Sequence, residues 1–203
     1  MTTQAMTTRR WPGWLWWSVT GLLSLAVAVF SYRYLAGVGL LAPNVLANAF
    51  AAPWLLVHVA GAATALLIGS AQFIAPLRRR LPATHRWTGR VYAAACLVGG
   101  VGGLMLSFGS TAGPVAATGF GLLAVVWLAT TSLGWRTALA RELAAHRRWM
   151  IRSWALTLAA VTLRLYMAAI PLIPADVMTV YSAIAWLCWV PNLLVAELYL
   201  RRT

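Results

Sequence analysis

The chain has very few charged residues for its length of 203 residues. Only 9% of the residues are charged, only three are acidic, and none is lysine, so the 16 basic residues are all arginine. Soluble domains carry about 25% charged residues, whereas 62% of this chain is hydrophobic. The scarcity of charge excludes an ordinary soluble domain, and lipid is the solvent that the composition predicts.

The net charge of +13 does not indicate a nucleic-acid-binding protein. A nucleic-acid-binding domain gathers its basic residues on one folded face, but these arginines lie in short segments between long apolar runs. Only Glu142, Asp176 and Glu197 balance them. The pattern is one of membrane topology, and we expect the arginine-rich surface to attract anionic lipid head groups.

Cysteine and the common catalytic motifs are also scarce. The two cysteines, Cys96 and Cys188, have neither CxxC nor CxxCH spacing and lie near the middle of apolar stretches, which predicts two small buried residues. The sequence contains no HExxH, no pair of acids on one helix and no Ser-His-acid set that fits one membrane depth. Zinc and hydrolytic chemistry are therefore poorly supported, and the sequence assigns no catalytic residue.

Six apolar stretches are long enough to cross a bilayer as helices. A hydrocarbon core about 30 Å thick needs roughly 20 apolar residues in a helix. The stretches are residues 14–32, 54–77, 87–108, 115–135, 149–170 and 177–200, and residues 1–13 form a tail before them. The sequence therefore predicts a single all-α integral membrane domain, a bundle of six transmembrane helices.

The arginines set the predicted orientation of this bundle. With six helices, all arginines except Arg33 and Arg164 fall on one side of the membrane. Loops rich in arginine stay in the cytoplasm. We therefore expect both termini, including the tail of residues 1–13, to be cytoplasmic.

Two short segments of the chain are similar to each other. Thr84-His85-Arg86-Trp87, followed by Arg90, is echoed by Ala145-His146-Arg147-Arg148-Trp149, followed by Arg152. Each segment leads from an arginine-rich loop into a helix that runs toward the opposite side. This echo suggests two related helical hairpins, packed side by side in parallel.

Arg164 is the charged residue that lies deepest in a predicted span. A charged arginine in hydrocarbon costs on the order of 3 kcal/mol or more, so it should face the bundle interior or water and have a partner. Asp176 is the nearest acid in the sequence, and the carboxylate of a bound ligand is the alternative. A packing ion pair, snorkelling to the interface and ligand binding all remain open at this point.

His58 lies at a similar depth, about one turn inside the outer edge of the second span. It could hydrogen-bond a neighbouring helix or ligate the iron of haem b, with Met105 or Met167 as the sixth ligand and Arg164 bound to a propionate. The glycine-rich run of residues 99–103 would let a flat macrocycle approach the third helix, or would let another helix pack closely. We expect an outer-leaflet site whose cofactor-binding candidates are His58, Met105 and Arg164.

A second group of polar residues is predicted at the cytoplasmic edge of four helices. Its members are Gln72, His85, Arg86, Arg90, His146, Arg152, Asn192 and Glu197. Glu197 should be ionised and paired with Arg90 or Arg152. The group could also bind a quinone head group or an anionic ligand. A haem between His85 and His146 is a weaker alternative than a solvated basic rim, because each histidine precedes its predicted helix.

The motifs around these polar residues resemble a known family. The motifs are His58 with Gly69 and Gln72, His85-Arg86 with Gly89-Arg90 and Tyr92, Trp149-Met150 with Arg152-Ser153, Thr162 with Arg164, and Asn192 with Ala196-Glu197. In their order and spacing they resemble the domain-of-unknown-function 2306 family of prokaryotic predicted membrane proteins. The resemblance covers the second to sixth spans and implies a helical protein of the bacterial inner membrane. It implies no substrate and no reaction.

These observations support three functional hypotheses. The first is a haem- or quinone-associated redox protein, with His58 on the haem iron. The second is a carrier for a small molecule or a lipid, with His58 and Arg164 in a cavity between the hairpins. The third is a structural or assembly subunit of a larger membrane complex, with arginine-rich loops that dock a cytoplasmic subunit; a homo-oligomer is the alternative partner.

Overall fold

The computed structural model describes residues 13–38 and 43–202, so the predicted tail of residues 1–13 lies outside the described residues apart from Gly13. The described part of the chain is helical and contains no strand. Six of its helical segments are long and apolar enough to cross a membrane, namely Ser18–Ala36, Ala51–Phe73, Pro82–Phe108, Gly113–Leu139, Leu143–Leu172 and Val177–Arg201. The predicted all-α architecture with six membrane-spanning helices is confirmed.

Some of these spans consist of more than one helix. The first is α1 (Gly13–Ala36), and the second is α3 (Ala51–Gly69) with the 3-10 turn η1 (Ser70–Phe73). The third and fourth are α5 (Pro82–Phe108) and α6 (Gly113–Leu139). The fifth is α7 (Leu143–Thr157) and α8 (Ala159–Ala169) with η2 (Ile170–Leu172), and the sixth is α9 (Val177–Leu187) and α10 (Val190–Arg201). Short helices α2 (Pro43–Leu46) and α4 (Ala75–Arg80) lie in the connections.

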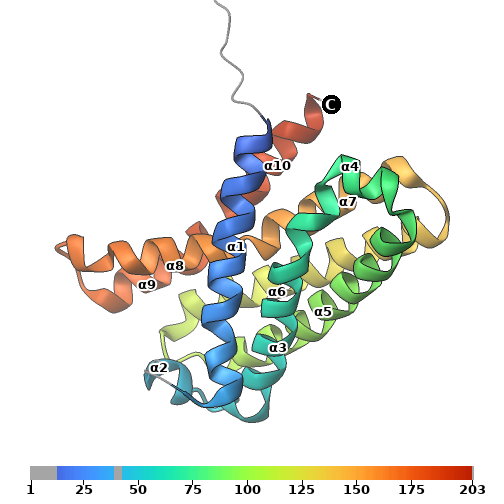
Figure 1. Ribbon diagram of the computed structural model, residues 1–203. Helices are drawn as coiled ribbons and strands as arrows, with labels where there is room; N and C mark the ends of the chain where they lie inside the picture. The colour runs from blue at the N-terminus through green and yellow to red at the C-terminus, as the bar shows by residue number, and fades with distance from the viewer. Residues whose placement is uncertain (1–12, 39–42, 203) are drawn as a thin grey trace, which may run out of the picture.

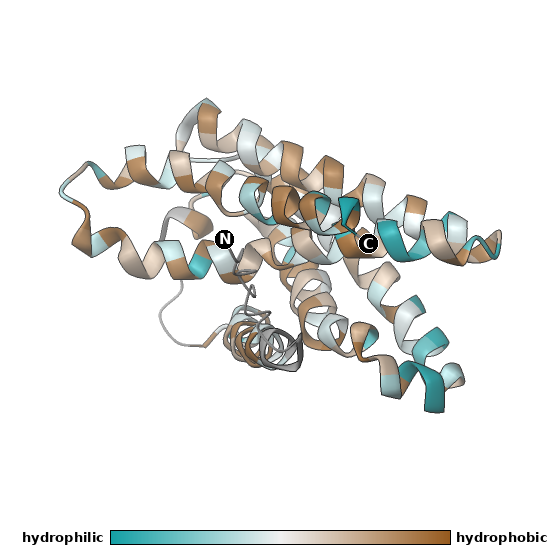
Figure 2. Ribbon diagram, turned by 90° about the horizontal axis from the view of Figure 1, so that it is seen from above, coloured by the Kyte–Doolittle hydropathy of each residue, from teal (hydrophilic) through white to brown (hydrophobic). Residues whose placement is uncertain are grey.

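The arginines gather at one end of the bundle. In Figure 1, α4, the start of α1 and the end of α10 lie toward the top, whereas α2 lies at the bottom and the turn between α8 and α9 at the far left. Figure 2 shows most of the strongly hydrophilic ribbon on its right-hand half. We call this the arginine-rich end; its arginines are Arg78, Arg79, Arg80, Arg86, Arg90, Arg136, Arg141, Arg147, Arg148, Arg201 and Arg202.

The helices extend beyond their apolar stretches at the arginine-rich end. α5 begins at Pro82, because proline has the backbone geometry of a first helical residue and needs no N–H partner there. α7 begins at Leu143. His85 and His146 therefore lie in the first turns of α5 and α7, and the prediction that each histidine precedes its helix is wrong. Long arginine side chains reach water from such a turn, so a helix can continue past its apolar stretch.

The glycine-rich run of α5 packs against α3. A Cβ atom on Gly99 would lie 2.7 Å from the backbone nitrogen of Ala62, and one on Gly102 would lie 2.6 Å from that of His58. Such distances leave no room for a side chain. The close-packing interpretation is confirmed for Gly99 and Gly102, which meet the α3 backbone, while Gly99, Gly100 and Gly103 also line the cavity described below.

The fifth and sixth spans are both interrupted within the bundle. Pro191 follows the break between α9 and α10, where its missing N–H and its ring prevent a continuous helix. The side-chain nitrogen of Asn192 lies 3.3 Å from the carbonyl oxygen of Ala155 and 3.0 Å from that of Cys188, next to the two breaks. It also donates to the hydroxyl of Thr162 at 2.9 Å. Asn192 therefore ties the two interrupted spans together, and Figure 1 shows the α8–α9 hairpin projecting away from α7 and α10.

Candidate functional site: a cavity with His58 and Arg164

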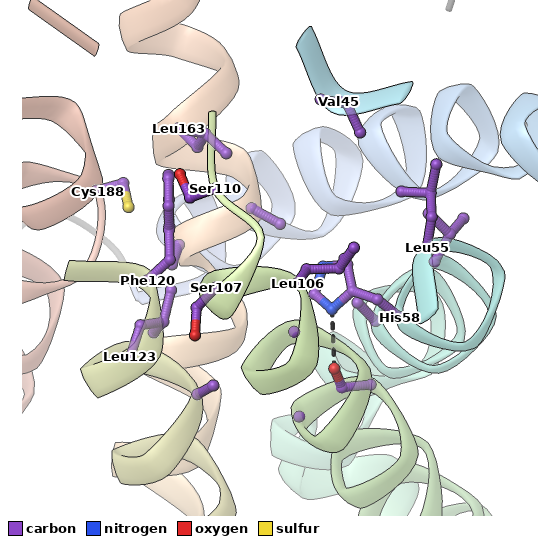
Figure 3. A pocket seen from close by; sticks show the side chains of 18 of the residues that line it. Val45, Leu55, His58, Leu106, Ser107, Ser110, Phe120, Leu123, Leu163 and Cys188 are labelled. Carbon is purple, nitrogen blue, oxygen red and sulfur yellow. Dashed lines mark hydrogen bonds between the residues drawn. The ribbon is translucent and has the colours of Figure 1, made fainter. Parts of the chain in front are cut away.

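A cavity of about 280 Å³ lies between α3, α5, α6, α8 and α9. Asn48 and Ser110 line it toward the end opposite the arginine-rich end, and Trp127 and Leu156 line it near the middle of the spans. Figure 3 shows His58, Ser107 and Phe120 around it, on different helices. The interrupted spans contribute to its wall, because Leu156, which precedes the break of the fifth span, and Cys188, at the break of the sixth, also line it.

Arg164 lines this cavity from α8 and has only neutral hydrogen-bond acceptors. Its Nη2 donates to the hydroxyl of Ser31 on α1 at 2.7 Å, and its Nη1 donates to the carbonyl oxygen of Ala160 at 2.9 Å. Within residues 13–38 and 43–202, the ion pair that the structure contains joins Arg152 to Glu197 instead. The cavity therefore presents a guanidinium group without an acidic partner among the described residues.

Asp176 is not the partner of Arg164, and that prediction is corrected. Its carboxylate accepts a hydrogen bond from the backbone N–H of Thr179 at 2.9 Å and one from the Thr179 hydroxyl at 3.1 Å. These bonds cap the first turn of α9 and lower the pKa of the Asp176 carboxyl. Asp176 is used at a helix N-terminus because a carboxylate there satisfies amides that have no partner within the helix.

His58 lines the cavity from α3, and one of its ring nitrogens is engaged. Nδ1 lies 2.8 Å from the carbonyl oxygen of Gly99 on α5, the contact drawn as a dashed line in Figure 3. Since a carbonyl only accepts hydrogen bonds, Nδ1 carries the proton and donates it. Nε2 has no hydrogen-bond partner among the described residues. His58 and Arg164 also line a second space of about 60 Å³ next to Ser31.

The structure brings His58 and Arg164 together but not the methionines. Both polar residues line the same two spaces. Met105 and Met167 line neither of them, and Met167 is 40% exposed on the outside of α8. The cavity therefore offers His58 as a ligand for iron and no described methionine opposite it.

At the arginine-rich end, Arg152 of α7 and Glu197 of α10 form a two-pronged ion pair. Nε of Arg152 lies 2.5 Å from Oε1 of Glu197, and Nη2 lies 2.9 Å from Oε2. Of the two predicted partners for Glu197, Arg152 is confirmed. Arg90 instead stacks on the ring of Trp87, with its guanidinium carbon 4.8 Å from the ring centre.

The other members of the predicted polar group are dispersed over separate contacts. Gln72 donates to the hydroxyl of Thr88 at 2.7 Å, and Nδ1 of His146 lies 2.8 Å from the carbonyl oxygen of Gly134. Asn192 bonds at the helix breaks instead. His85 is half-buried and Arg86 is exposed, beside each other in the first turns of α5. These contacts tie helices in pairs and do not converge on one space.

Sequence reasoning missed a buried network of hydroxyl groups. Trp127 donates to the Thr157 hydroxyl at 3.0 Å, and that hydroxyl donates to the Ser153 carbonyl at 2.9 Å. Tyr92 must therefore donate its own proton to Thr157 at 2.9 Å, which leaves its oxygen to accept from the Ser153 hydroxyl at 3.2 Å. Thr131 then donates to Ser153 at 2.8 Å. All four hydroxyl groups thus donate their protons within the network, which ties α5, α6 and α7 together.

The only sequence signal of this network was the presence of Tyr92 and Ser153 among the resemblance motifs. Hydroxyl residues in a helix usually bond to the carbonyl four residues earlier, and no spacing rule shows which of them meet across helices. Tyr92 is 1% exposed and Ser153 is fully buried. The network forms the polar floor beneath the cavity, which Thr157 and Trp127 also line.

Comparisons with known proteins agree with this architecture. The family model described as "Predicted membrane protein (DUF2306)" matches residues 55–200. No curated protein and no solved structure matches the chain. The matched region contains His58, Arg164, Arg152 and Glu197 but not Ser31, which α1 supplies. The chain belongs to the DUF2306 family of predicted membrane proteins.

Proposed function

We propose that the protein binds a small organic anion in the cavity that His58 and Arg164 line. The observation that carries this proposal is Arg164, whose guanidinium meets only neutral acceptors among the described residues. An unpaired charge in a membrane span is costly and marks a ligand site or a transport pathway. A carboxylate bound beside Arg164 would supply the missing charge through strong, charge-assisted hydrogen bonds.

The size of the cavity restricts the ligand. The cavity measures about 280 Å³. This volume lies near the lower limit of small-molecule sites. A compound of one ring or a short chain fits better than a two-chain lipid, with its carboxylate near Arg164 and its apolar part against Leu123, Trp127 and Leu156.

We infer a carrier function because the cavity lies beside two interrupted helices. Transporters bind their substrates near the bilayer midplane, where broken helices bring backbone irregularities to a cavity wall. The breaks after Thr157 and at Cys188 lie near the middle of the fifth and sixth spans, which supports this proposal. The arginine-rich end is cytoplasmic in this proposal, in the inner membrane of a bacterium, and the cavity receives its ligand from the opposite side. Anionic lipids would surround the arginine-rich end.

Thermal unfolding of the purified protein in detergent tests the binding. A ligand that binds only the folded state raises Tm. Phenylacetate at saturating concentration should raise Tm by at least about 3 °C, whereas uncharged 2-phenylethanol of similar size should have little effect. Arg164→Gln should abolish the shift, and Arg90→Gln at the arginine-rich end should keep it. Equal shifts with both compounds would refute a site for anions.

Haem ligation by His58, for a redox function, is the second candidate, and one observation favours it. Metal-ligating histidines donate their other ring N–H to a carbonyl or carboxylate, as Nδ1 of His58 does toward Gly99. Against it stands the absence of Met105 and Met167 from the lining of the cavity. A reduced-minus-oxidised absorption spectrum decides: this candidate requires a Soret band that disappears in His58→Ala, and a protein without such a band excludes it.

A further inference from the structure

His58 supplies a hydrogen-bond acceptor to the cavity, which determines what a bound anion must offer. Nδ1 donates to the Gly99 carbonyl, so Nε2 carries the lone pair of the neutral ring. A second proton on the ring would place another positive charge in the same two spaces that Arg164 lines, inside a membrane span. Nε2 is therefore an acceptor without a protein donor among the described residues.

The site combines one strong donor with one acceptor. Arg164 donates and carries positive charge, and His58 accepts; both line the cavity and the small space beside it. A simple carboxylate satisfies Arg164 but leaves Nε2 without a donor, so a ligand that also donates to Nε2 gains one hydrogen bond. An ammonium group would satisfy Nε2 but would be repelled by Arg164.

We propose that the ligand class is the small hydroxy acids, with the carboxylate on Arg164 and the hydroxyl donated to Nε2 of His58. This inference rests on the proposed function, since it names the substrate class of the same cavity. His58 would then determine specificity. A site built to hydrogen-bond a hydroxyl discriminates against the analogue that lacks it, which hydrophobic fit alone does not do.

Equilibrium binding of three matched probes to the purified full-length protein tests the inference. Mandelate carries the carboxylate and the hydroxyl, phenylacetate lacks the hydroxyl, and phenylglycine carries an ammonium group in its place. Mandelate should bind about fivefold more tightly than phenylacetate, which is the gain of one net hydrogen bond. Phenylglycine should bind more weakly than both.

The variant His58→Leu distinguishes the hydroxy-acid inference from the proposed anion binding on which it rests. We expect it to bind phenylacetate within about twofold of the natural protein, because Arg164 is unchanged, and to lose the preference for mandelate. If phenylacetate binds but mandelate binds no better, or if the preference survives in His58→Leu, the hydroxy-acid inference is overturned while the anion site stands. If none of the three probes binds, the proposed function fails and this inference with it.

Discussion

Arg164 holds its charge at membrane depth through contacts that are all neutral. Ser31 reaches it from α1, 133 positions earlier in the chain, and Ala160 lies one turn before it on α8. The Ser31 hydroxyl in turn donates to the Val27 carbonyl at 2.6 Å, so its oxygen is oriented to accept. This arrangement positions the guanidinium without neutralising it, which suits a residue that must remain available to an anion.

Ser31→Ala should therefore destabilise the protein. Removing the hydroxyl leaves one N–H of Arg164 without its acceptor, and an unsatisfied buried donor costs about 1–3 kcal/mol. Thermal unfolding in detergent should show a lower Tm for Ser31→Ala. Ser18→Ala on the exposed face of α1 is the matched control and should leave Tm unchanged. If the two variants unfold alike, the Arg164–Ser31 contact contributes nothing to stability.

Tyr92→Phe removes the central hydroxyl of the buried network. The Thr157 hydroxyl then loses a donor and the Ser153 hydroxyl loses its acceptor, both in a buried site. We expect the free energy of unfolding to fall by about 1–3 kcal/mol, measured by denaturant titration in mixed micelles. Tyr166→Phe, at a half-buried tyrosine of α8, should change it by less than about 0.5 kcal/mol. The reverse order would contradict the assigned network.

Among the helices, the fifth and sixth spans are connected next to their breaks by one side chain, that of Asn192. Asn192 bonds to Ala155 and Cys188 next to the breaks, as well as to Thr162 on α8. Asn192→Leu preserves the volume but leaves two carbonyls without their donor. We expect a loss of about 1–3 kcal/mol in unfolding free energy, whereas Leu194→Ala on the exposed face of α10 should have a small effect. A stable Asn192→Leu protein would show that the breaks do not need this amide.

The straight parts of the elements could be predicted from the sequence, but their bends and pairings could not. Apolar length determines where a helix can cross lipid, so all six spans were recognisable. Pro191 is visible in the sequence, but the position of the break before it depends on how α9 packs. No proline marks the break after Thr157. Contacts such as Arg164–Ser31 join residues that no local pattern relates. Because the chain has so few acids, the sequence narrowed the ion-pair partner of Glu197 to two arginines, Arg90 and Arg152.

The helical-hairpin repeat stays a prediction at this scale. His85 and His146 occupy equivalent places, in the first turns of α5 and α7. The hairpins that follow differ, because α5 and α6 are continuous whereas the fifth and sixth spans are broken. If the hairpins are related, the second has acquired the breaks that line the cavity.

For the whole molecule, the arginines gather at one end, and the cavity reaches from the opposite end to the middle of the spans. The arginines gather where α4, the start of α5 and the end of α10 lie, and the cavity is lined by Asn48 and Ser110 at the far end. With the arginine-rich end in the cytoplasm, as proposed, we expect this mouth of the cavity on the outer side. Ser110→Cys, in a protein with both natural cysteines replaced by alanine, should then react with a membrane-impermeant maleimide in intact cells. Labelling only after the membrane is broken would reverse the proposed orientation.

The central claim is that Arg164 binds a small organic anion in the cavity. Calorimetric titration of phenylacetate into the purified protein tests this claim most directly. The account predicts saturable binding at one site to the natural protein and to Arg90→Gln. It predicts an affinity at least about tenfold lower in Arg164→Gln, since a hydrogen bond to a charged group contributes about 1.5–3 kcal/mol. Binding of equal strength in Arg164→Gln, or the absence of binding to the natural protein, would contradict it.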